Sequence, residues 1–136
     1  MAEQKLTKED LINVADSLSY LASKETPAWY QIGKNLRAIK PFMKEVEGVR
    51  EDIKKNCGAY DENGQLKTEK LNGMEMIVWK DKKAEKEQQQ IWKEFINEDA
   101  PELKWHKFSI DKLKDVELNG GLLSNLIDLI IIEDGE

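Results

Sequence analysis

The stretch WYQIGKNLRAIKPFMKEVEGVREDI, residues 29–53, decides the fold of this chain. Its apolar residues follow one another at spacings of three and four, and only Arg50 interrupts the series: Trp29, Ile32, Leu36, Ile39, Met43, Val46 and Ile53. This period describes one apolar stripe along a helix of about 30 residues, roughly 45 Å long. Thr26 is placed to cap the helix, and Pro27 fits its first turn, where a missing N–H costs nothing.

The residues before this stretch predict a second, shorter helix from about Lys8 to Lys24. Thr7 is placed to cap it, and Asp10 lies three residues on, like the acid of a capping box. The apolar residues of this segment trace one helical face: Leu11, Val14, Ala15, Leu18, Leu21 and Ala22. Because only a short link separates the two helices, we predict an antiparallel helical hairpin over residues 1–58.

The long apolar stripe has a second interpretation, a dimeric coiled coil. It runs for fewer than four heptads, however, and the shorter helix offers a matching face nearby, so the intramolecular hairpin is favoured. Pro41 removes the backbone bond to the carbonyl of Arg37, which predicts a kink in the long helix. Gly58 follows the last helical residues and predicts a C-terminal cap there.

Residues 59–136 predict a small α+β portion that packs on the long helix within one domain. Asn72-Gly73 is a strong hairpin signal, and a tight turn there would pair Leu71 with Met74, Lys70 with Glu75, Thr68 with Ile77 and Leu66 with Trp79. The alternating segment 103–110 predicts a third strand, which a two-stranded hairpin needs for stability. Segments 81–97 and 122–130 predict two covering helices. The predicted fold class is therefore α+β, with a helical hairpin and a small antiparallel sheet.

Composition limits the classes of function. The 136 residues include 27 acids and 21 bases, well mixed, for a net charge of −6, which does not suit a nucleic-acid partner. The single Cys57 excludes an internal disulfide and fits a reducing cytoplasm. No apolar run approaches the ~20 residues needed to span a bilayer, and the N-terminus lacks the apolar core of a signal peptide. We expect a soluble protein without a membrane partner.

The residues that carry chemistry are few. Cys57 and His106 are the only thiol–base pair, and a thiol at a helix C-terminus has a raised pKa, which disfavours a nucleophile. One His and one Cys cannot build a structural zinc site, and the acids around Asp61 read as solvated turn residues. Glu102-Leu103-Lys104 has the Glu-x-Lys spacing of a metal-dependent nuclease, but no preceding strand supplies its Asp. We predict no cofactor, no metal and no enzymatic activity.

Four stretches carry a family resemblance: Thr26–Ile32, Gly33–Leu36 with Glu45–Lys55, Asp61–Lys67, and Trp92–Ile96 leading to Ser109–Leu113. They resemble a family of small uncharacterised proteins of tailed phages and prophages from Gram-positive and gut bacteria. Pro41 and the Asn56-Cys57-Gly58 segment depart from the pattern. The resemblance implies a phage context and an α+β fold with a helical hairpin. It transfers no active-site residue.

These observations predict a protein that acts by binding another protein. Tyr20 and Tyr30 lie off the apolar stripes, and Trp29 opens the long helix beside Tyr30, although its place on the stripe favours a core role. Exposed aromatics mark partner surfaces, so Tyr20, Trp29 and Tyr30 are the candidate binding residues. Two roles follow from the resemblance: an inhibitor of a host enzyme or defence system in the host cytoplasm, or a virion or tail/head-assembly accessory.

Overall fold

Two helices open the chain: the first begins where the sequence predicts, and the second begins at Trp29, so that Pro27 precedes it instead of lying in its first turn. The computed structural model describes residues 5–133. Helix α1 (Lys8–Ala22) starts at the predicted capping box: the Thr7 hydroxyl accepts from the Asp10 N–H at 3.2 Å, and the Asp10 carboxylate accepts from the Thr7 N–H at 3.0 Å. Helix α2 (Trp29–Cys57) follows, and the Thr26 hydroxyl accepts from the Ala28 N–H just before it. Pro41 lies inside α2 without ending it.

The chain divides into two compact units. The first contains residues 5–43 and 98–133 of the described chain, and the second contains residues 44–97. Neither boundary coincides with residue 58, where the sequence suggests a division. Helix α2 runs through both units, and the unit boundary at Met43 falls two residues after Pro41.

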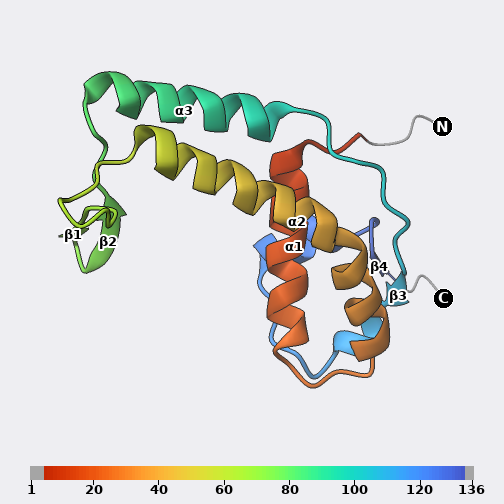
Figure 1. Cartoon of the computed structure of the whole chain (residues 1–136). Coiled ribbons are helices and arrows are strands. Elements are labelled where there is room, and N and C mark those ends of the chain that lie inside the picture. Colours follow the sequence, from red (N-terminus) through yellow and green to blue (C-terminus); the bar gives the residue numbers. More distant parts are fainter. Residues whose placement is uncertain (1–4, 134–136) are drawn as a thin grey trace. The chain divides into compact units, whose positions relative to one another are not determined.

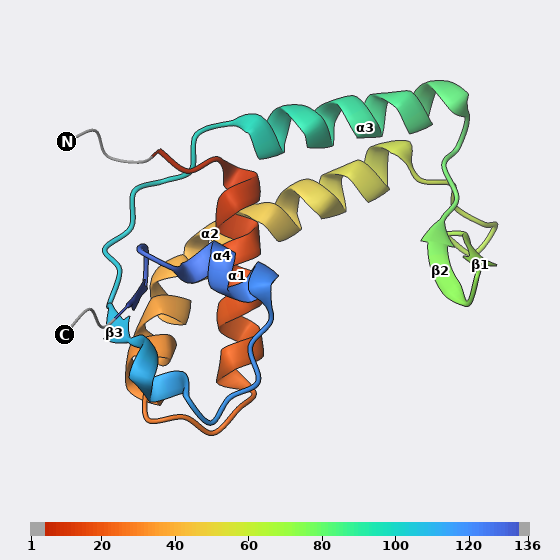
Figure 2. The ribbon, with the colours of Figure 1, turned by 180° about the vertical axis from the view of Figure 1, so that it is seen from behind.

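The first unit has most of the buried apolar side chains. Helix α4 (Gly120–Leu126) packs on α1, as Figure 2 shows, and its N–H groups are capped by Asn119. Strand β3 (Phe108–Ser109), the 3₁₀ turn η1 (Ile110–Leu113) and strand β4 (Ile131–Ile132) complete this unit, with β3 and β4 parallel. The core comprises Leu11, Val14, Ala15, Leu18, Leu21, Ala28, Ile32, Ile39, Phe42, Phe108, Leu113, Leu122, Leu126, Ile130 and Ile131.

The final helix is shorter than predicted. It ends at Leu126 instead of continuing to residue 130, because Asp128 adopts a positive φ of 65° and turns the chain. This turn brings Ile131 beside Phe108 in the parallel pair, where both side chains are buried. Of the apolar residues after Leu126, Ile131 and Ile132 therefore form a strand, and none continues the helix.

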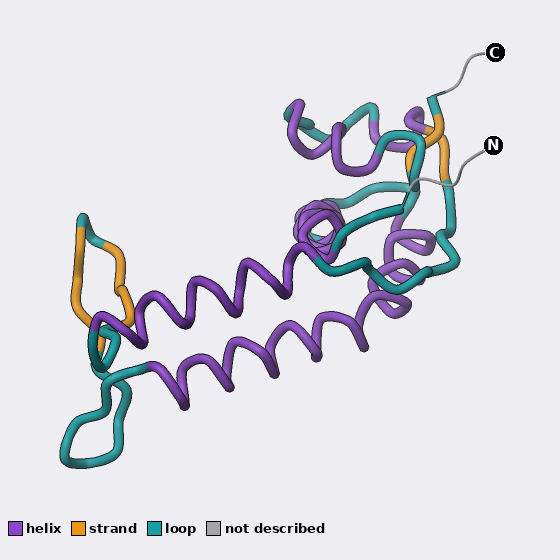
Figure 3. Tube along the Cα trace, turned by 90° about the horizontal axis from the view of Figure 1, so that it is seen from above, coloured by secondary structure: helices purple, strands orange, loops and turns teal. Residues whose placement is uncertain are grey.

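The second unit confirms the predicted β-hairpin. Strands β1 (Thr68–Leu71) and β2 (Met74–Ile77) pair in the predicted register, Thr68 with Ile77 through Leu71 with Met74. Asn72 and Gly73 both have positive φ, 53° and 80°, as a tight two-residue turn between twisted strands requires. Helix α3 (Lys82–Asn97), capped by Asp81, runs alongside the second half of α2 (Figures 1 and 3).

The predicted third strand of this sheet is wrong. Of segment 103–110, only Phe108 and Ser109 form a strand, and they pair with β4 instead of the hairpin. The hairpin is extended by the chain that leaves α2: the Ala59 N–H donates to the Val78 carbonyl, and the Lys67 N–H donates to the Ala59 carbonyl, both at 2.8 Å. This segment therefore occupies the backbone groups at the open end of the hairpin.

The same segment corrects two smaller predictions. Leu66 and Trp79 do not face each other, because Leu66 pairs with Tyr60 and Trp79 pairs with Gly58 in isolated β-bridges. Helix α2 ends directly before Gly58 as predicted, but Gly58 lacks the positive φ of a capping glycine. Its missing side chain has another use: a Cβ there would lie 2.5 Å from the Lys54 carbonyl oxygen and 2.6 Å from Leu66 Cδ1. Glycine is therefore required at position 58 because the chain packs closely at the end of α2, and not because the backbone adopts a left-handed conformation.

Candidate functional site

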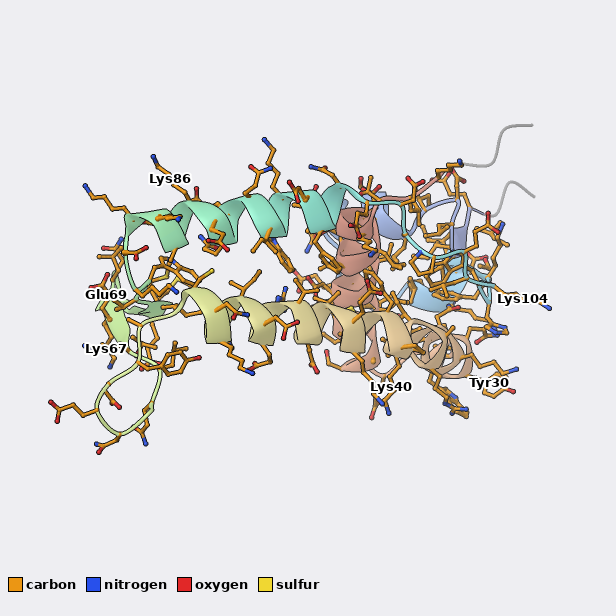
Figure 4. The ribbon with its side chains drawn as sticks, turned by 45° about the horizontal axis from the view of Figure 1, so that its top comes forward. Tyr30, Lys40, Lys67, Glu69, Lys86 and Lys104 are labelled. Carbon is orange, nitrogen blue, oxygen red and sulfur yellow. The ribbon has the colours of Figure 1, made fainter. Side chains whose placement is uncertain are left out.

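The first turn of α2 presents two aromatic side chains to solvent. Trp29 is 68% exposed and Tyr30 is 50% exposed. Their rings meet edge to face, with centroids 5.8 Å apart and planes at 76°, the arrangement that aromatic quadrupoles favour. The Lys34 ammonium lies 4.8 Å from the Tyr30 ring centroid, one helical turn away. Figure 4 shows Tyr30 pointing away from the ribbon.

The exposure of Trp29 contradicts its predicted place on the buried stripe. Ala28 and Ile32, one turn apart, are both almost fully buried and hold the first turn of α2 against the core. Since adjacent helical residues point about 100° apart, Trp29 and Tyr30 then face outward. The 3–4 spacing that begins at Ile32 extends back to Ala28 and not to Trp29. The sequence could have shown this, because Ala28 stands four residues before Ile32.

Tyr20 lies apart from this pair. It is half-buried, and its hydroxyl donates to the Glu117 carbonyl at 2.9 Å, which ties α1 to the loop before α4. The Lys24 ammonium lies 5.1 Å from its ring centroid. Within residues 5–133 Tyr20 makes no ring contact with Trp29 or Tyr30. The structure thus brings two of the three candidate residues together, and the third has a structural hydrogen bond.

A second apolar surface, which the sequence did not predict, lies on the β-hairpin. Leu71, Met74 and Met76 are 59%, 66% and 46% exposed, and the register places them on one face of the two strands. Because side chains alternate along a strand, the predicted register already placed these residues together. We expected a covering element on this face, and its exposure became apparent only from the structure.

The thiol and the imidazole of the predicted candidate pair lie in different units. Cys57 belongs to the second unit and His106 to the first. Cys57 is 1% exposed, and burial, with the nearby Glu87 carboxylate as a smaller cause, raises the pKa of its thiol. The Asn35 side chain holds the His106 backbone: the His106 carbonyl accepts from Asn35 Nδ2 at 3.0 Å, and the His106 N–H donates to Asn35 Oδ1 at 2.8 Å.

The nuclease-like residues, Glu102 and Lys104, lie outside the assigned strands. Glu102 and Lys104 are exposed and lie in an extended segment, residues 101–107, that forms no strand. Glu102 and Asp99 line a hollow of about 460 Å³ together with Leu103 and Trp105. Among residues 5–133, no group of three His, Cys, Asp or Glu side chains is placed to hold a metal ion. None of the helices in this range combines the length and the apolar character needed to span a bilayer.

Comparison with known proteins adds no family. No protein-family model, no curated protein and no solved structure matches this chain. The resemblance to phage proteins stays a prediction.

Proposed function

We propose that this chain is a non-enzymatic protein that binds another protein through Trp29 and Tyr30. The exposed edge-to-face pair carries the proposal. Aromatic side chains bury large areas at interfaces and lose little rotamer entropy, which makes them frequent anchors of binding energy. A helix also holds the pair more rigidly than a loop would. Together with α1, which we propose to pack antiparallel to the first half of α2, this turn forms a preorganised contact point.

Two roles are compatible with such a contact. In the first, the chain is an early phage factor that binds and blocks a host enzyme or a defence system in the cytoplasm. In the second, it is a virion or assembly accessory that docks on tail or head proteins. Mass spectrometry of purified particles separates the two, because an assembly accessory that stays in the virion is present in stoichiometric amount and an inhibitor is absent.

The binding role is tested directly by photo-crosslinking. A photoreactive phenylalanine analogue replaces Trp29 in one variant and the exposed Gln89 of α3 in a matched control. We expect a covalent adduct with one discrete protein from the position-29 variant and none from the control. Adducts that are equally abundant at both positions, or absent at both, would remove the support for a binding surface at the start of α2.

The rival enzymatic role has its own test. If the chain were a metal-dependent nuclease, plasmid and linear DNA would be cleaved in the presence of Mg²⁺ or Mn²⁺, and Glu102→Ala would abolish the cleavage. We expect no cleavage by either protein.

A further inference from the structure

The outward face of the first half of α2 combines aromatic and basic side chains. Tyr30, Lys34 and Arg37 follow one another at i, i+4 and i+7, and therefore form one stripe along the helix. Trp29 and Lys40 form the adjacent stripe, at i and i+11. We call these five residues the basic face. Behind them, Ile32, Asn35, Ile39 and Phe42 point into the core of the first unit and are buried.

The charge of this face departs from the charge of the chain. The protein carries a net charge of −6, yet no Asp or Glu occurs between Glu25 and Glu45. Arg37 and Lys40 are exposed and Lys34 is half-buried. In the part of the chain that the structure describes, none of these three bases forms an ion pair. Within residues 5–133 their charge is thus not neutralised by an ion pair, and it is available to a partner.

From this charge complementarity we infer that the partner is a protein segment with carboxylates beside apolar side chains, such as an acidic amphipathic helix. The inference rests on the proposed function and names the chemistry of its partner. Trp29 and Tyr30 supply apolar contact at one end of the basic face. Lys34, Arg37 and Lys40 then extend along the helix for about 15 Å from Tyr30, at a rise of 1.5 Å per residue. An acidic segment of two to three helical turns would match this length, by roughly 5.4 Å per turn.

A nucleic acid fits this surface less well. Polyanion binding depends on the neutralisation of many phosphates, and the net charge of −6 opposes the approach of a long polyanion. A short acidic segment presents only a few charges and buries its apolar side chains against the aromatic pair. Binding should therefore weaken with salt but retain an apolar contribution.

The inference is tested with labelled probes and fluorescence anisotropy. The probes are a helical peptide with Glu on one face and Leu on the other, the same peptide with Gln in place of Glu, and a single-stranded oligonucleotide of equal charge. Three proteins are compared: the original chain, Lys34→Glu/Arg37→Glu/Lys40→Glu, and the control Lys67→Glu/Lys70→Glu/Lys86→Glu. The control residues are exposed and belong to the second unit, and Figure 4 labels Lys67 and Lys86. Circular dichroism verifies folding, and Gln substitutions at the same positions provide a milder series.

We expect the Glu/Leu peptide to bind the original chain and the control, and to lose about tenfold or more in affinity with the basic-face variant. The Gln/Leu peptide should bind weakly to all three proteins. Equal binding of the Glu/Leu peptide to all three proteins, no binding to any of them, or tighter binding of the oligonucleotide would overturn the inference. Failure of the proposed function looks different: the photo-adduct at position 29 is then missing, whatever the charge at positions 34, 37 and 40.

Discussion

Gly58 allows close packing where α2 ends and the chain joins the β-hairpin. A Cβ at Gly58 would overlap the Lys54 carbonyl oxygen and Leu66 Cδ1, at 2.5 and 2.6 Å. The first of these atoms belongs to the backbone and cannot move without disturbing the end of α2. Gly48 offers a comparison, since it lies inside α2, ten residues before Gly58, and a Cβ there meets nothing within 4 Å.

We therefore expect opposite effects from one substitution at these two glycines. Gly58→Ala should lower the free energy of unfolding by about 1–3 kcal/mol, because the chain must shift to admit the methyl group. Gly48→Ala should raise it by roughly 0.5–1 kcal/mol, since alanine loses less backbone entropy in a helix. Urea unfolding followed by circular dichroism measures both. A Gly58→Ala protein as stable as the original would contradict the close packing.

The buried thiol of Cys57 yields a pH prediction. Burial raises the pKa of this group above its ordinary value of 9.0, so the folded protein holds the thiol proton at pH values where the unfolded chain has lost it. The unfolded state then binds fewer protons, and the free energy of unfolding falls as pH rises above about 9. Below that pH both states hold the proton, and the thiol has no effect on pH dependence.

Alkylation by iodoacetamide across a pH series measures this shift. The midpoint of the rate profile should lie higher in the folded protein than in the urea-unfolded chain, and Cys57→Ser should show no reaction in either state. Equal midpoints would mean that Cys57 is not desolvated.

At the scale of elements, local signals in the sequence predicted starts and turns correctly. Thr7 with Asp10, Asp61 in its turn, and Asn72-Gly73 all act within four residues, so the chain around them is sufficient to define the geometry. The partner of the third strand could not be predicted in this way. Segment 103–110 alternates like a strand, but its position depends on Asn35, which is 71 residues from His106 in the sequence.

Asn35 is fully buried and anchors this segment to α2 through two hydrogen bonds to the His106 backbone, at 2.8 and 3.0 Å. Asn35→Ala leaves the part-buried N–H and carbonyl of His106 without these partners, and should lower the free energy of unfolding by roughly 2–3 kcal/mol. Gln31→Met is the control, because the Gln31 side-chain oxygen is buried without a hydrogen-bond partner among residues 5–133, and its removal should be neutral or stabilising. If both variants matched the original in urea, the anchor would be dispensable.

At the scale of the whole molecule, the apolar stripe of α2 predicted one long helix but concealed two units. The 3–4 spacing continues from Ile39 through Met43 to Val46 without a change. An apolar stripe indicates that one face of the helix is buried, but it does not indicate which segments of the chain cover that face. The candidate site was affected in the same way: the stripe placed Trp29 inside, although Ala28 takes that position in the core.

We expect different residues to determine the stability of the molecule and its binding to a partner. Phe42 lies on the same helix as the aromatic pair but is only 4% exposed, so Phe42→Ala should lower the free energy of unfolding by roughly 3–5 kcal/mol. Trp29→Ala with Tyr30→Ala removes two large side chains that keep half or more of their surface in water, and should lower the free energy of unfolding far less than Phe42→Ala does. The affinity of the double variant for its partner, or for the Glu/Leu peptide, should nonetheless fall about tenfold or more, because aromatic side chains of this kind anchor interfaces. Urea unfolding and anisotropy on the same preparations measure both quantities. If the double variant were as unstable as Phe42→Ala, Trp29 and Tyr30 would stabilise the fold. If it keeps the stability of the original chain but binds weakly, the two side chains act in binding and not in folding.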